Sequence, residues 1–216
     1  MSLPLTRAGG QDDVAPEHPC LYVDFASAEA YLTAERILGF MPVAVEWVPV
    51  RARDLAHAVA PEGLRCAEEE AIWREELERI ARERGLQPVR WPAAVPFDSD
   101  AVLRAATFAK SIGKGVAFTQ AAFRQAYAGG GDLTRPDTVV IAAAACEIHP
   151  RAVLAALEQR SVAAALDRAT ARARERGVHS VPAIWTPPQG PAPAQVFHGD
   201  DQLEAAAAHL GEQAAR

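Results

Sequence analysis

The sequence predicts an α/β fold in which two strand-containing segments are separated by a long segment of helices. Three observations predict it. A strand–helix–strand pattern lies near the start of the chain, a proline bend followed by two strands and a helix lies near its end, and helical patterns fill the residues between them. With 216 residues, half of them hydrophobic, the chain is long enough to bury one substantial core.

The first segment reads as a strand, a helix and a second strand. The apolar run 21–25 predicts a strand, and 26–38 predicts a helix because Tyr31, Ala34 and Leu38 recur at helical spacing. Apolar and other residues alternate over 42–50, which predicts the next strand. Parallel pairing of the two strands across the helix requires a right-handed crossover, so this segment is expected to be a βαβ unit.

The middle of the chain is expected to be helical. Residues 68–84 place Trp73, Leu77 and Ile80 on one face opposite a charged face, and Gly85 follows where glycine commonly ends a helix. Ser161 is expected to cap the helix that runs to residue 176 and returns the chain to the sheet. Between them, further helices are expected over 101–110, 116–127, 138–146 and 151–159.

The last segment begins at a bend that contains Val181 and Pro182. A proline between a turn and a strand marks an edge, a bulge or a cis peptide, and we predict a cis peptide here. Residues 183–186 and 195–198 read as short strands, and a helix follows from about residue 200.

Composition excludes two classes of partner. The net charge is −6, and no basic stripe is interleaved with aromatic residues, so DNA and RNA are not expected to bind. The most apolar run, 138–146, is far shorter than the roughly 20 residues that a membrane helix needs. Residues 1–19 lack the pattern of an export signal and are predicted to form a flexible N-terminus. The expected location is the cytoplasm.

The three cysteines are scattered. Cys20, Cys66 and Cys146 form no CxxC pair, so a dithiol redox cycle is not expected, and no Cys/His cluster has the spacing of a zinc site. No metal ligand is therefore assigned. In a cytoplasmic protein these cysteines are most simply reduced and mostly buried.

Short motifs in one order, spread over residues 20–210, resemble the 2-hydroxychromene-2-carboxylate isomerase family. That family is similar to kappa-class glutathione transferases and belongs to the DsbA-like group. The motifs are Phe25-Ala26-Ser27 with Tyr31-Leu32, Arg84-Gly85-Leu86 with Trp91-Pro92, Ala122-Phe123-Arg124, Ala144-Ala145-Cys146-Glu147, and two that begin at Gly177 and Gln195.

The resemblance implies a thioredoxin-like fold with a large all-helical insertion. We therefore predict a discontinuous thioredoxin-like domain over 20–53 and 160–212 and a helical insertion domain over 54–159. It also implies a cofactor, glutathione or another small thiol. The family has a serine at the position of Ser27, where a hydroxyl and the start of a helix stabilise a thiolate, so Ser27 is the candidate catalytic residue.

The same resemblance implies further contacts with the thiol. The backbone of Val181, before Pro182, pairs with the cysteinyl unit as an added strand would, and Asp201, with Asp200 beside it, matches the acidic residue that holds the γ-glutamyl amine. Each has a structural alternative. Ser27 is also a good N-cap, one residue being able to fill both roles, and Asp201 with Glu204 fits a capping box. For Asp200 the capping role is the more favoured.

Four residues depart from the family pattern: Ala28, Glu29, Gln202 and Ser180, which stands where the family has a glycine before Val181. Glu29 is expected to place a negative charge near the thiolate and so to raise the pKa of the thiol.

Other charged residues near the site have weaker assignments. Arg51 and Arg53 are expected to be solvated surface charges. His179 and His198 flank the site, either as a general base or as lining.

Two enzymatic functions and one binding function follow from the resemblance. The first is thiol-dependent cis–trans isomerisation by addition and elimination of a thiolate, expected in aromatic catabolism. The second is kappa-like glutathione transfer to an electrophile. The third is a degenerate binding protein without catalysis, which the departures at Ala28, Glu29 and Gln202 motivate. The resemblance favours an enzyme with a small-molecule substrate and allows a homodimer.

Overall fold

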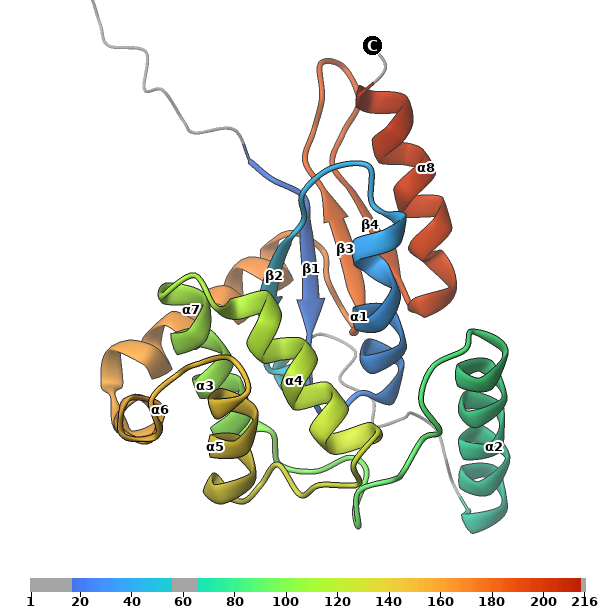
Figure 1. The fold of residues 1–216 in the computed structure, drawn as a ribbon. Coiled ribbons are helices and arrows are strands. Elements are labelled where there is room, and N and C mark those ends of the chain that lie inside the picture. The colour runs from blue at the N-terminus through green and yellow to red at the C-terminus, as the bar shows by residue number, and fades with distance from the viewer. Residues whose placement is uncertain (1–16, 56–65, 215–216) are drawn as a thin grey trace, which may run out of the picture.

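A four-stranded mixed sheet forms the centre of the molecule (Figure 1). The computed structural model describes residues 17–55 and 66–214, so most of the N-terminal segment predicted to be flexible lies outside the described residues. The strand order is β2-β1-β3-β4, with β1 parallel to β2 and antiparallel to β3, and β3 antiparallel to β4. The strands are β1 (Cys20–Val23), β2 (Glu46–Pro49), β3 (Ala183–Thr186) and β4 (Gln195–His198).

The two faces of the sheet belong to two hydrophobic cores. Leu21 and Ile184 face a large core that includes α1 (Ala28–Phe40) and the start of α8 (Leu203–Ala214). Tyr22 and Trp185 face a smaller core completed by α7 (Arg160–Glu175). Adjacent strand residues point to opposite faces, so each short strand serves both cores.

Helices inserted between β2 and α7 extend the larger core beyond the sheet. Short 3-10 turns, η1 (Ala52–Asp54) and η2 (Asp200–Gln202), precede the insertion and α8. In Figure 1, α3 to α6 gather beside the β2 edge and α2 lies beyond α1. The inserted helices are α2 (Ala67–Glu83), α3 (Asp100–Ser111), α4 (Gly115–Tyr127), α5 (Pro136–Ala144) and α6 (Pro150–Glu158). No helix in the described residues is long and apolar enough to span a membrane.

The expected fold is confirmed, and so are two helix ends. Ser27 caps α1, and Gly85 follows α2 with a φ of +68°. Two local predictions are wrong. Ser161 does not cap α7, which begins at Arg160 after an extended Gln159. Leu38 is 61% exposed, because the buried face of α1 runs through residues 31, 34 and 37 and the next residue points about 100° away from it. The predicted domain limits stay a prediction.

Candidate functional site

The candidate site lies where the start of α1, the turn before β3 and the end of β4 meet. Figure 1 shows these three points at one end of the sheet. The Ser27 hydroxyl oxygen accepts a hydrogen bond from the Ala30 amide at 3.2 Å, and the hydroxyl donates to the Val181 carbonyl at 3.4 Å. Two of the predicted site residues, far apart in sequence, are thus in direct contact.

The turn before β3 has the conformation that its proline predicts. The Val181–Pro182 peptide is cis, as expected. The Pro182 carbonyl accepts a hydrogen bond from the Gly199 amide at 2.9 Å, which joins this turn to the segment that carries Asp200 and Asp201. Gly199 has a φ of +93°, and a Cβ there would lie 2.6 Å from a carboxylate oxygen of Asp201, so only glycine suits this position.

Asp200 has its own partners. Its side chain is buried, with a residue exposure of 5%, and accepts a hydrogen bond from the Thr33 hydroxyl at 3.0 Å. One carboxylate oxygen lies 2.5 Å from an Arg84 guanidinium nitrogen and 3.7 Å from one of Arg36. These contacts tie α1 and the end of α2 to the start of η2, so Asp200 serves the scaffold.

Asp201 is exposed, and its carboxylate accepts a hydrogen bond from the Gln202 side chain at 3.2 Å. The alternative capping box is not formed, because Glu204 pairs instead with Arg36. Of the two neighbouring acids, only Asp201 presents a carboxylate that an external amine can reach.

Glu29 occupies the first turn of α1 and is half-buried. Burial raises the pKa of its carboxyl group, and the negative charges of Asp200 and Asp201 raise it further. The departure that the sequence showed at this position therefore places a half-buried carboxyl group with a raised pKa in the first turn of α1.

The two histidines beside the turn stack on each other. The ring centroids of His179 and His198 are 3.6 Å apart, and the His179 amide donates to Nε2 of His198 at 3.2 Å. Burial and the neighbouring His179 lower the pKa of His198 to about 4. A neutral ring whose acceptor nitrogen is already used is a weak base, so His198 fits a lining role.

Asp24 is a buried carboxyl group that sequence reasoning missed. It lies just after β1 and accepts hydrogen bonds from the amides of Ala26 and Ala52, at 3.0 and 2.9 Å. Burial raises its pKa. Its backbone carbonyl accepts from the Ser27 amide at 3.1 Å. Asp24 therefore fixes the backbone that leads to Ser27, the N-cap of α1. The sequence signal that could have identified Asp24 is a charged residue inside an otherwise apolar run.

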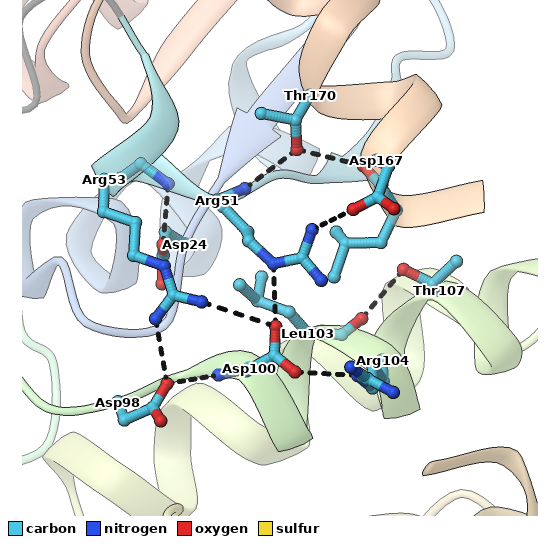
Figure 2. A network of polar contacts seen from close by, with 12 residues as sticks. Asp24, Arg51, Arg53, Asp98, Asp100, Leu103, Arg104, Thr107, Asp167 and Thr170 are labelled. Atoms are coloured by element: carbon cyan, nitrogen blue, oxygen red, sulfur yellow. Dashed lines mark hydrogen bonds and ion pairs between the residues drawn. The ribbon is translucent and has the colours of Figure 1, made fainter. Parts of the chain in front are cut away.

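Arg51 is not the solvated charge that the sequence led us to expect. It is 8% exposed and pairs with Asp100 of α3 at 2.7 Å and with Asp167 of α7 (Figure 2). Arg53 is more exposed and pairs with Asp98 and Asp100. Both guanidinium groups have partners, so neither is assigned to a ligand.

The cysteines lie outside the site. Cys20 and Cys146 are buried, Cys66 is exposed, and all three are free thiols. Burial raises the pKa of both buried thiols. In residues 17–55 and 66–214, no three His, Cys, Asp or Glu side chains are grouped to hold a metal ion.

Solved structures with the same fold cover almost the whole chain. A 2-hydroxychromene-2-carboxylate isomerase is 18% identical with a TM-score of 0.77, over 91% of this chain and 97% of that one. A probable DsbA oxidoreductase from Streptomyces coelicolor is 17% identical with a TM-score of 0.70, over 92% and 90%. The cytosolic disulfide reductase DsbM from Pseudomonas aeruginosa, solved with GSH, is 14% identical with a TM-score of 0.62, over 92% and 99%. At these identities the likeness shows the fold alone.

Sequence comparison identifies the family. A comparison with curated proteins finds no match. The model of the DSBA-like thioredoxin domain matches residues 21–211, which is nearly the full length. The chain therefore belongs to the DSBA-like thioredoxin domain family.

Proposed function

We propose that this protein is a thiol-dependent isomerase of the 2-hydroxychromene-2-carboxylate isomerase type. Its cofactor would be glutathione or a similar small thiol, bound at Ser27, Val181, Pro182 and Asp201. The observation that carries the proposal is the contact between the Ser27 hydroxyl and the Val181 carbonyl, beside the cis Pro182 and at the start of α1. A solved relative that contains GSH is consistent with the choice of thiol.

The contacts of Ser27 fit a thiol. Its bond to the Val181 carbonyl is long, at 3.4 Å, and hence weak. A hydroxyl that turns from this carbonyl toward a thiol sulfur keeps its bond from the Ala30 amide. The Ser27 hydroxyl would then donate a hydrogen bond to the sulfur at the positive end of the α1 dipole, and the hydroxyl and the dipole both stabilise a thiolate. The carbonyl of Val181 is then free to accept an amide hydrogen, as in an added strand.

We assign different roles to the two neighbouring aspartates, Asp200 and Asp201. Asp201, exposed at the start of η2, suits the ammonium group of a γ-glutamyl unit. Asp200 is committed to Arg36 and Arg84, so we assign it to positioning Asp201 rather than to binding.

A bound thiol supplies a sulfur nucleophile that adds to an unsaturated carbonyl compound and leaves again, so that the former double bond can rotate between the two steps. The residues of the chain hold the sulfur ionised and keep the thiol oriented. Kappa-like transfer to an electrophile would use the same residues, and the fate of the thiol separates the two reactions. A cytoplasmic location and a homodimer stay predictions.

The test is turnover of benzylidenepyruvate, an unsaturated α-keto acid, with and without glutathione. We expect isomerisation with glutathione regenerated, and Ser27→Ala should lower the rate by about 10²-fold, the effect of one anion-stabilising donor. Loss of the cap should cost only about 1 kcal/mol of folding free energy. Ser111→Ala, which removes an exposed hydroxyl at the end of α3, is the control.

Three other results would redirect the proposal. Consumption of glutathione would identify a transferase. Equal rates in the wild type and Ser27→Ala would make Ser27 a cap only. A wild type inert with every thiol tried would support the binding-protein alternative.

A further inference from the structure

The turn before β3 is held to the end of β4 at two points. The His179 amide, at the start of the turn, donates a hydrogen bond to Nε2 of His198 at 3.2 Å. At the end of the turn, the Pro182 carbonyl accepts a hydrogen bond from the Gly199 amide at 2.9 Å. Two consecutive residues of the chain therefore hold both ends of the turn that carries Val181.

Few other backbone groups of this turn have a partner. In the part of the chain that the structure describes, the amides of Ser180 and Val181 donate no hydrogen bond. The Val181 carbonyl accepts only the long bond from Ser27, at 3.4 Å. The proline that follows has no amide hydrogen. Among the described residues, the His179 amide is thus the backbone donor that fixes the turn ahead of Val181, and His198 is its acceptor.

The His198 ring is itself fixed. It is half-buried and stacks on the His179 ring, with the centroids 3.6 Å apart. Nε2 of an imidazole accepts a hydrogen bond only when it carries no proton, so this bond requires the neutral ring with its hydrogen on Nδ1. The lowered pKa of His198 favours the neutral ring at neutral pH. A stacked, neutral ring therefore suits the role of a fixed acceptor for the His179 amide.

We propose that His198 is a positioning residue of the thiol site, which fixes the turn so that Val181 can pair with the cysteinyl unit of glutathione or a similar thiol. This inference rests on the proposed function. The same end of β4 leads into η2 and Asp201, so it sets the place of Val181 relative to the carboxylate assigned to the γ-glutamyl amine. A ligand that spans both points binds more tightly when they are held in place before it arrives. His198 transfers no proton in this role.

Two substitutions separate the acceptor from the ring. His198→Phe keeps a stacked ring and removes the acceptor, whereas His198→Gln loses the ring but carries an amide oxygen that can accept in place of Nε2. His149→Phe is the matched control, because Nδ1 of His149 also accepts a backbone amide hydrogen, that of Arg151 at 3.1 Å, at the start of the inserted helix α6. Two measurements apply: hydrogen exchange of the His179 amide by NMR, which needs no ligand, and glutathione affinity by calorimetry.

We expect His198→Phe to speed exchange of the His179 amide about tenfold and to weaken glutathione binding about tenfold, the scale of one hydrogen bond. His198→Gln should stay within about threefold of the wild type in both measurements, because an acceptor remains. His149→Phe should leave both unchanged, although it removes the cap of α6. In the wild type, the NMR shifts of the ring nitrogens should place the hydrogen of His198 on Nδ1.

The inference and the proposed function can fail separately. If the wild type binds glutathione and His198→Phe binds it equally well, His198 has no positioning role. Equal losses of affinity in His198→Phe and His198→Gln would also overturn the inference, because the effect would then not depend on an acceptor. Unchanged exchange of the His179 amide in His198→Phe would show that the bond does not fix the turn. A wild type that binds no thiol overturns the proposed function itself, and this inference with it.

Discussion

Two clusters of acidic side chains in this protein differ in how far arginines neutralise them. In the Arg51 network, which comprises Arg51, Arg53, Asp98, Asp100, Arg104 and Asp167, every carboxylate has an arginine partner (Figure 2). In the candidate site, Asp200 has two arginines, whereas Glu29 and Asp201 have none in the described residues.

The pKa directions record this difference. Hydrogen bonds from Arg51 and Arg104 lower the pKa of Asp100 despite its burial, and burial with like charges raises that of Glu29. A compensated cluster joins β2, α3 and α7 and needs no ligand. In the candidate site the exposed carboxylate of Asp201 has no arginine partner and is available to the amine of a ligand, so we assign binding to the second cluster and scaffolding to the first.

The largest expected effect is a loss of folding stability, caused by a substitution that removes Arg51 from the first cluster. Arg51→Met leaves Asp100 without its most buried partner and should lower the free energy of unfolding by about 3 kcal/mol, measured in urea. Arg53→Met is the matched control, because its side chain is 60% exposed, and should cost about 1 kcal/mol or less. Similar costs for the two variants would contradict the distinction between the buried and exposed arginines.

The next effect is the loss of folding stability at low pH, which tests whether the protein environment of His198 disfavours its protonated form. His198 has a folded pKa of about 4, below its ordinary value near 6.5, so the unfolded chain binds more protons between these values. Stability should therefore fall as pH is lowered from about 6.5 to 4. The full pKa difference corresponds to about 3 kcal/mol, and we expect about 2 kcal/mol because the ring is only half-buried and solvent screens its interactions. His198→Phe keeps an aromatic ring and should show that much less loss in thermal or urea unfolding. An unchanged acid profile in the variant would refute the assignment.

The smallest effect separates the two neighbouring aspartates. Asp201→Asn should weaken glutathione binding about tenfold, the scale of one charge-assisted hydrogen bond, with little change in Tm. Asp200→Asn should instead lower Tm, because it leaves Arg36 and Arg84 facing a neutral amide. The reverse pattern, with binding lost at Asp200 and stability at Asp201, would exchange their roles.

Local patterns predicted the fold because its signals are short-range. The apolar runs of β1 and β2, the capping serine of α1, the glycine after α2 and the proline before β3 each depend on a few neighbouring residues. The Ser161 cap was wrong because extended Gln159 starts the helix earlier, a choice that helix packing makes and that propensity alone does not resolve.

Side-chain partners across the fold were not predictable in the same way. Asp200 is held by residues of α1 and of the end of α2, and Arg51 is held by residues of α3 and α7. These pairs join residues more than 40 positions apart, and no pattern in the sequence reports which charges meet. The raised pKa of Glu29 also depends on residues distant in sequence, Asp200 and Asp201. The sequence therefore showed Glu29 as a departure from the family pattern but not the neighbours that raise its pKa.

The most direct test of the account is the ionisation of glutathione bound to this protein, followed by the ultraviolet absorbance of the thiolate as pH is raised. The measurement needs no substrate. We predict that binding lowers the thiol pKa from its free value of about 8.5–9, and that Ser27→Ala brings it back toward that value. A bound thiol that titrates as it does in free solution, with or without the Ser27 hydroxyl, would contradict the assignment of Ser27 and Val181 to a thiolate site.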